Sequence, residues 1–265
     1  MLPSALDHVE EIAGKDGRDL AIFLDYDGTL TPIVTDPENA LLSDSMKQTL
    51  RALVRHVPVS ILSGRDLDDV RRRVDIDGII YAGSHGFDIA GPGDLRKEVA
   101  TEFLAKLDLA ERKLREKLAE IVGALVERKR FSIATHYRLV KESDFPRLER
   151  VVRDVAAQHR ELRGMDGKKV YEMQPDIDWD KGKAVLWLLQ TFDLKHANVL
   201  PMYIGDDRTD EDAFRAIGKS GIAILVSEQP RVTAASYLLK DPMEVQQFLR
   251  GLVACLDQRR NSTQG

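Results

Sequence analysis

Two aspartates separated by a single residue stand at the end of a short apolar run. The run 21–24 is followed by Asp25, Tyr26 and Asp27, and then by Gly28 and Thr29. A short apolar run bounded by turn residues predicts a buried strand, and open α/β sheets bind their ligands at the carboxyl ends of strands. Two buried carboxylates this close together are unfavourable unless a cation or a proton neutralises them. Taken alone, the segment is equally compatible with a strand that ends in an ordinary Asp-Gly turn.

The amino-acid composition is typical of an ordinary soluble globular protein. The 265 residues are 43% hydrophobic and 31% charged, which suits one domain with an insertion or two small domains. A net charge of -5 argues weakly against nucleic acid as a partner. One cysteine suits a reducing compartment. There is no basic n-region, no apolar h-region and no apolar stretch of membrane-spanning length. We therefore expect a cytoplasmic protein that binds no membrane. A small-molecule partner and a monomeric state are separate expectations.

Strand and helix patterns alternate at both ends of the chain. The expected strands are 21–24, 57–62, 78–82, 199–204, 222–226 and 237–239, and the expected helices are 43–56, 66–74, 183–192, 210–217 and 243–256. This order predicts an α/β fold with a parallel sheet, right-handed crossovers and helices on both faces.

The middle of the chain has a different pattern. A charged amphipathic helix is expected over 98–129, an alternating strand over 131–140, a second helix over 144–160 and a second strand over 168–173. Alternation indicates a sheet covered on one face only. We interpret 91–174 as an inserted α/β cap domain that determines substrate specificity, hinged at 91–94, and 1–90 with 175–265 as the core domain.

Two further segments place chemistry-bearing residues beside helix starts. Ser63, Gly64 and Arg65 follow an apolar strand and precede a helix, so a hydroxyl and backbone N–H groups can meet an anion there. Lys181 and Gly182 open another helix, where a cation opposes the helix dipole unless an anion compensates it. A simple Ser-Gly turn and a solvated lysine are the alternatives.

Acidic residues also follow the strand expected at 199–204. Asp206 and Asp207 come directly after Gly205, and Asp210 lies a turn further on. Helix capping explains some of these acids but not the adjacent pair. A hard divalent cation with oxygen ligands accounts for the pair.

In this order, the four segments resemble the haloacid dehalogenase (HAD) superfamily of phosphohydrolases, whose Rossmann-like core carries such a cap. The motifs at 83–86, 135–138, 178–184 and 205–212 are similar to those of the trehalose-6-phosphate phosphatase family. One departure is Asp88, where that family usually carries glutamate.

The resemblance implies a phosphatase that forms an aspartyl-phosphate. Asp25 would attack phosphorus, and Asp27 would protonate the departing sugar oxygen and then activate water, which requires Asp27 to carry a proton at the start. Ser63 and Lys181 would hold the phosphoryl oxygens. Mg²⁺ would be bound by Asp25, Asp206 and the backbone carbonyl of Asp27. Asp207, like Asp210, would hold a water ligand or orient the direct ligands.

Substrate recognition is assigned to side chains that could reach the sugar: Arg65, His85, His136, Arg138, Lys141 and Glu172. Arg65 could instead pair with Asp68 or Asp69, and the cap residues could be a solvated sheet face. A phosphatase for sucrose phosphate or a glycosyl phosphoglycerate, a phosphomutase and a non-catalytic binding protein remain alternatives.

Overall fold

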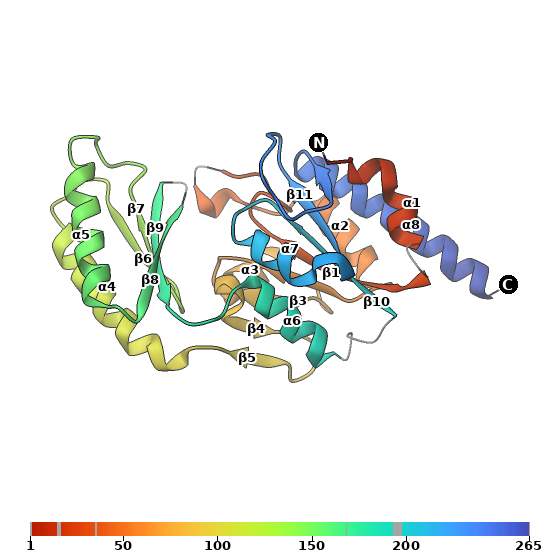
Figure 1. Ribbon diagram of the computed structural model, residues 1–265, viewed down its shortest axis with the longest axis horizontal. Coiled ribbons are helices and arrows are strands. Elements are labelled where there is room, and N and C mark those ends of the chain that lie inside the picture. Colours follow the sequence, from red (N-terminus) through yellow and green to blue (C-terminus); the bar gives the residue numbers. More distant parts are fainter. Residues whose placement is uncertain (1, 15–16, 35, 168, 193–197, 265) are drawn as a thin grey trace. The chain divides into compact units, whose positions relative to one another are not determined.

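The protein divides into two compact units. The computed structural model describes residues 2–14, 17–34, 36–167, 169–192 and 198–264 (Figure 1). One unit is Met1–Lys97 with Trp179–Gly265, and the other is Glu98–Asp178. We refer to them as the core unit and the cap unit.

A mostly parallel sheet runs through the core unit. Its strand order is β12-β11-β10-β1-β2-β3-β4-β5, and the first six of these strands are parallel. The strands are β1 (Asp19–Asp25), β2 (Val59–Leu62), β3 (Ile80–Gly83), β4 (Asp88–Ala90), β5 (Arg96–Glu98), β10 (Val199–Gly205), β11 (Ile222–Val226) and β12 (Tyr237–Leu239). Because β1 lies between β10 and β2, its carboxyl end is flanked by the ends of both neighbours.

Helices cover both faces of this sheet, which confirms the predicted α/β core (Figure 1). On one face the hydrophobic cluster contains residues of α1 (Val9–Gly14), α2 (Asp44–Leu53), α3 (Leu67–Val74) and α8 (Pro242–Gln264). On the other it contains residues of α6 (Lys181–Thr191) and α7 (Asp210–Ile217). Within β1, Leu20, Ile22 and Leu24 belong to the first cluster, and Ala21 and Phe23 to the second. A strand buried on both faces explains the continuous apolar run in the sequence.

Two short core strands lie beyond the predicted ones. β4 pairs antiparallel with β3, and β5 follows it at the sheet edge. The segment 91–94, expected to be a hinge, instead connects these two strands. The units divide at 97/98 and 178/179 rather than at the expected 90/91 and 174/175. Three-residue strands carry too little periodicity to be recognised from sequence.

The cap unit contains a four-stranded antiparallel sheet with the order β6-β7-β9-β8. Its elements are α4 (Leu104–Leu118), β6 (Leu125–Arg128), β7 (Ile133–His136), α5 (Phe145–Gln158), β8 (Leu162–Gly167) and β9 (Val170–Pro175). Buried side chains of both helices pack with Val126, Ile133, Tyr171 and Met173 of the sheet. The alternation of β7 therefore places one sheet face against the helices, as predicted.

Three of the predicted cap elements are wrong in extent. The helix expected over 98–129 ends at Leu118, and β6 takes its last residues. Gly123, with φ of +89°, forms the turn between them. The strand expected over 131–140 ends at His136, so Arg138 lies in the following turn and not on the strand face. β8 was not foreseen, and β9 begins at Val170, while Lys168 lies outside the described residues.

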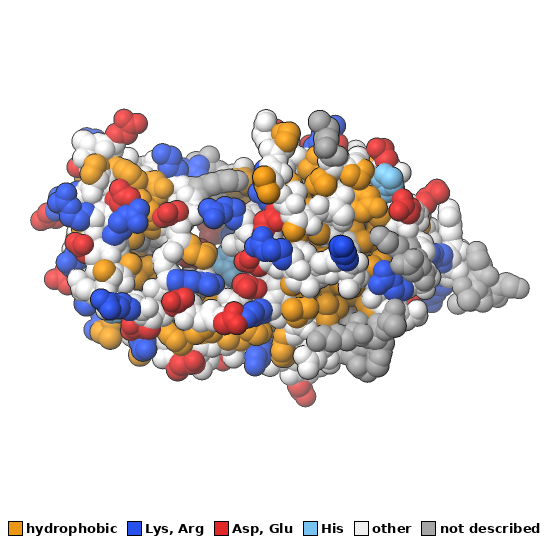
Figure 2. All heavy atoms as spheres, viewed as in Figure 1, with side chains coloured by type: hydrophobic (Ala, Val, Ile, Leu, Met, Phe, Trp, Pro, Cys, Tyr) orange, Lys and Arg blue, Asp and Glu red, His pale blue; other side chains and the backbone are white. Residues whose placement is uncertain are grey.

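The surface carries both signs of charge. Figure 2 shows acidic and basic side chains intermixed over the visible face. Among the described residues, the helices are too short or too polar to cross a membrane.

Candidate active site

Asp25 ends β1 and is almost fully buried, with 5% of its surface exposed. The Nζ of Lys181 donates to Asp25 Oδ1 at 2.6 Å and to Asp210 Oδ1 at 2.7 Å. Lys181 is only 2% exposed, so the alternative of a solvated lysine is wrong. Asp180 begins α6 by accepting the N–H of Lys183, which fixes the helix start that carries Lys181.

The buried charges shift one another's protonation. Burial raises the pKa of Asp25 well above its usual value, and Lys181 opposes that effect. Burial by itself lowers the pKa of Lys181, but the carboxylates of Asp210 and Asp25 outweigh it and raise that pKa well above the usual value. The lysine is therefore a fixed cation beside Asp25.

Asp210 is held by three donors. Besides Lys181, it accepts from the hydroxyl of Tyr203 at 2.8 Å and from the backbone N–H of Asp207 at 2.8 Å. Burial, followed by the charge of Asp210, raises the pKa of Tyr203 well above its usual value, so the tyrosine stays a donor. Asp210 thus orients Lys181 and the turn that follows β10.

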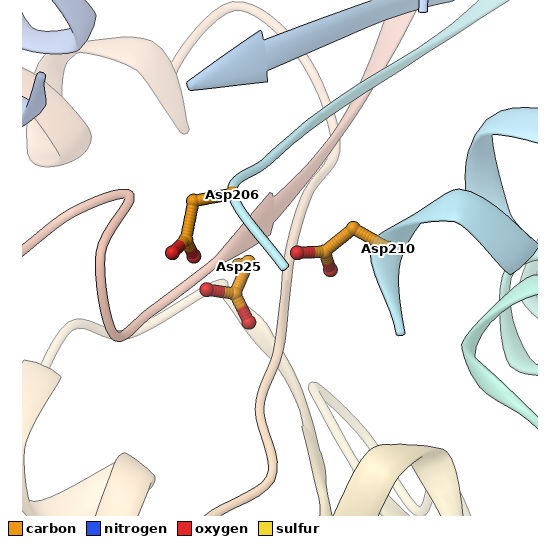
Figure 3. A group of neighbouring side chains, drawn as sticks. All are labelled: Asp25, Asp206 and Asp210. Carbon is orange, nitrogen blue, oxygen red and sulfur yellow. The ribbon is translucent and has the colours of Figure 1, made fainter. Parts of the chain in front are cut away.

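Three carboxylates converge at this point (Figure 3). One oxygen from each of Asp25, Asp206 and Asp210 lies within 4.8 Å of the others. Gly28, with φ of +94°, makes this possible, because a Cβ there would lie 2.3 Å from Asp206 Oδ2. A set of oxygen donors at this spacing fits a hard divalent cation.

Asp207 is not a member of this group. Its side chain is exposed, and its Oδ1 accepts the N–H of the next residue, Arg208. Arg231 donates to the backbone carbonyls of Asp206 and Asp207, at 2.8 and 3.1 Å. The structure therefore places the carboxylate of Asp206 beside Asp25. Asp207 contributes backbone hydrogen bonds to the turn after β10.

The carboxylate of Asp27 is paired with a guanidinium. Arg65 donates from Nε to Asp27 Oδ2 and from Nη2 to Oδ1, each at 2.7 Å, and from Nη1 to Asp69 at 2.9 Å. Burial lowers the pKa of Arg65, but its hydrogen bonds to Asp27 and Asp69 raise it above the usual value. Asp69 is one of the partners expected for Arg65, and Asp27 was not foreseen.

Ser63 and His85 lie beside each other at the ends of β2 and β3. Ser63 follows Leu62, which pairs with Asp25, so the serine lies at the tip of the neighbouring strand. Its Oγ accepts the N–H of Arg65 at 3.1 Å, and its carbonyl accepts that of His85 at 2.8 Å. A Cβ on Gly64 would lie 2.7 Å from the His85 ring, so the glycine lets the imidazole approach the strand tip.

The His85 loop is conformationally strained. Ser84, His85 and Gly86 have φ values of +48°, +58° and +91°, a region that non-glycine residues seldom adopt. The Oγ of Ser84 donates to Asp66 at 3.0 Å, and Nε1 of Trp179 donates to the carbonyl of Gly86 at 2.9 Å. These bonds hold His85 in place, in keeping with strain concentrated at a functional site.

Comparison with known proteins identifies the family. The family model described as trehalose-phosphatase matches residues 23–243. Probable trehalose-phosphate phosphatase D of Arabidopsis thaliana is 43% identical over 265 residues, which cover 95% of this chain and 72% of the relative. The chain belongs to the trehalose-phosphatase family. Trehalose 6-phosphate phosphatase RA3 of Zea mays is 42% identical over 94% of this chain and 74% of the relative.

Solved structures share the fold of this trehalose-phosphatase family member. A trehalose-6-phosphate phosphatase of Aspergillus fumigatus matches with a TM-score of 0.68 and 28% identity, over 96% of this chain and 99% of that one. The C-terminal domain of the C. albicans trehalose-6-phosphate phosphatase has a TM-score of 0.81 at 22% identity, over 96% of this chain and 98% of that one. The HAD fold with its cap domain is thereby confirmed.

In this family member, charged side chains gather on the cap sheet face opposite the helices. His136 Nε2 lies 2.7 Å from Glu127 Oε2, and Glu172 Oε1 accepts from Ser132 at 2.6 Å and from Lys129 at 3.3 Å. The hydrogen bond with His136 lowers the pKa of Glu127. Antiparallel pairing of Glu127 with Ala134 and of Ala134 with Glu172 puts both acids on one face.

Glu127 and Lys129 were missed by the sequence reasoning because their segment was assigned to a helix. The alternation in 125–128, with only Val126 buried, was the available signal. His136 and Glu172 lie on the predicted sheet face, whereas Arg138 and Lys141 are exposed in the turn after β7. Asp88, the family departure, is buried and pairs with Arg96 at 2.8 Å.

Proposed function

We propose that this chain hydrolyses trehalose 6-phosphate to trehalose and phosphate. Membership of the trehalose-phosphatase family supports a phosphoric monoester hydrolase. The observation that carries the proposal is the buried contact of Lys181 with Asp25 beside Asp206, at the tip of β1. Stability does not require this arrangement, since buried ion pairs are seldom better than apolar packing.

Asp25 is the nucleophile in this proposal. Its carboxylate oxygen forms a bond to phosphorus as the bond from phosphorus to the sugar oxygen breaks, which gives an aspartyl-phosphate. Lys181, 2.6 Å from Asp25, favours the ionised carboxylate despite its burial. The same ammonium and the Ser63 hydroxyl would then bind the phosphoryl oxygens and stabilise the transition state.

Asp27 serves as the acid and base. As an acid it protonates the departing sugar oxygen, and as a base it takes a proton from the water that hydrolyses the aspartyl-phosphate. Two hydrogen bonds from Arg65, each 2.7 Å long, hold the carboxyl group of Asp27. The same group would donate the proton in the first step and accept one in the second.

Mg²⁺ is the cofactor that we propose. Asp25, Asp206 and the backbone carbonyl of Asp27 would bind it, while Asp210 orients the site. When bound, it neutralises charge between the nucleophile and the phosphate and polarises a phosphoryl oxygen. Asp207 is the weaker candidate, because its carboxylate is exposed and outside the converging group.

The cap unit, Glu98–Asp178, would select the sugar. Glu127, Lys129, His136 and Glu172 offer acceptors and donors side by side, as recognition of many hydroxyl groups requires. We assign Arg138, Lys141 and, from the core, His85 to the same role. The protein would act as a monomer. A single cysteine suits the cytoplasm, and a net charge of -5 argues against a nucleic-acid partner.

Phosphate release from a panel of sugar phosphates tests the proposal. We expect kcat/KM for trehalose 6-phosphate to exceed that for sucrose phosphate, glucosyl phosphoglycerate and glucose 6-phosphate by at least tenfold. Greater turnover of another member would overturn the substrate assignment. One free phosphate per sugar phosphate consumed is expected, and an isomeric sugar phosphate as product would indicate a phosphomutase instead.

A further inference from the structure

We propose that Arg65 is a positioning residue that orients the Asp27 carboxylate, and that it does not bind the substrate phosphate. This inference rests on the proposed function, because it assigns Asp27 to proton transfer. It replaces the expectation that Arg65 contacts the substrate.

The donors of Arg65 are already engaged within the protein. Nε and Nη2 form the two bonds to Asp27, Nη1 donates to Asp69, and Nη2 also donates to the carbonyl of Pro37 at 3.0 Å. These bonds use four of the five N–H groups of a guanidinium. Within the described part of the chain only one N–H group, on Nη1, remains, so a phosphate could accept two hydrogen bonds from Arg65 only by displacing one of the carboxylates or the carbonyl.

Arg65 is itself held from several sides. Asp69 Oδ2 accepts from Arg73 Nε at 2.9 Å as well as from Arg65. Arg73 is buried and also binds Glu38, through its carboxylate at 2.9 Å and its carbonyl at 3.0 Å. The α3 helix and the segment 37–38 thereby fix the guanidinium without help from Asp27.

Asp27 has more freedom than the group that binds it. Its side chain is 40% exposed, whereas that of Arg65 is 12% exposed. The backbone after β1 is fixed by Gly28 and by a hydrogen bond from the Leu30 N–H to the Tyr26 carbonyl. The carboxylate of Asp27 is oriented by the planar guanidinium of Arg65. Two parallel N–H···O bonds select one orientation, which a lysine ammonium cannot do.

The test compares Arg65→Lys with a control, Arg71→Lys, which changes an exposed arginine on the α3 helix that follows Arg65. We measure kcat and KM for trehalose 6-phosphate, and separately the Kd of inorganic phosphate by calorimetry with Mg²⁺ present. Arg65→Lys should lower kcat by roughly 10²-fold, the effect of a small misplacement of a catalytic group. KM and the phosphate Kd should stay within about threefold of wild type, and Arg71→Lys should change none of them.

Asp69→Asn provides a second variant that leaves Arg65 intact. It removes the charge that orients the guanidinium, so kcat should fall by a smaller factor, again without a change in the phosphate Kd. A rise of about tenfold or more in the phosphate Kd of Arg65→Lys would show that Arg65 binds phosphate and overturn the inference, as would an unchanged kcat. A wild-type protein that releases no phosphate from trehalose 6-phosphate would instead refute the proposed function.

Discussion

The two units use charge in opposite ways. In the core unit, Lys181 is buried and donates to two buried carboxylates, Asp25 and Asp210, at the carboxyl ends of parallel strands. In the cap unit, His136 and Glu127 remain 30% and 48% exposed on the face of an antiparallel sheet. Buried paired charges keep a fixed geometry and interact strongly, whereas exposed groups can exchange water for a ligand. The contrast suits a core that performs the chemistry and a cap that selects the substrate.

The largest effect is expected from removing the nucleophile, which tests whether the core unit performs the chemistry. Asp25→Asn should lower turnover by roughly 10⁴-fold or more, as expected when a covalent nucleophile is lost. The far-ultraviolet circular dichroism and the unfolding temperature should remain close to those of wild type. Appreciable activity in a carefully purified variant would remove Asp25 from the nucleophile role.

Removal of the metal should lower turnover as strongly as the Asp25→Asn substitution. Excess EDTA should abolish phosphate release, and added Mg²⁺ should restore it. Mg²⁺ should also stabilise the metal-free protein against unfolding, by about 2.7 kcal/mol at a hundredfold excess over Kd. Asp206→Asn should lose this stabilisation, and Asp207→Asn should keep most of it. Equal losses in the two variants would show that Asp207 is as important a ligand as Asp206.

Lys181→Met should be costly to the fold as well as to activity. It leaves Asp25 and Asp210 buried without their cation, which typically destabilises a protein by about 3–5 kcal/mol. Urea unfolding measures this change, with the half-buried Lys183→Met as the control. Similar losses in both variants would mean that the buried pair contributes no special stability.

Cap variants should change substrate choice and leave the chemistry intact. Glu172→Gln and Glu127→Gln should raise KM for trehalose 6-phosphate by roughly 5- to 100-fold, equivalent to about 1–3 kcal/mol. Turnover of p-nitrophenyl phosphate, which has no sugar, should be unchanged. Glu149→Gln, on α5 and paired with Arg153, is the matched control. An equal loss with both substrates would refute the division of labour between the units.

The sequence predicts the elements of the core unit more accurately than those of the cap unit, for a physical reason. The core strands are buried on both faces, so β1 and β10 appeared as continuous apolar runs, and the acids at their ends could be placed at once. In the cap, the charged segment 119–129 has both helical and alternating character, and only Gly123 marks the turn that separates α4 from β6. The sequence therefore assigns Glu127 and Lys129 to the predicted helix and not to the cap sheet or its edge.

Contacts between residues far apart in the chain could not be predicted from the sequence either. The contact of Lys181 with Asp25 joins residues 156 positions apart, and that of Arg65 with Asp27 spans 38. Motif order predicted that Lys181 lies in the site, but not that Arg65 would bind Asp27. Such pairings depend on strand order and on loop conformations that no local pattern specifies.

Trapping the covalent intermediate tests the central claim most directly. Wild-type protein is mixed with trehalose 6-phosphate and Mg²⁺, quenched during the first turnover and reduced with borohydride, which converts an aspartyl-phosphate to homoserine. Peptide mass spectrometry should then find the modification at position 25 alone, and only when substrate was present. Modification of Asp27 or another acid, or none despite rapid turnover, would contradict the account.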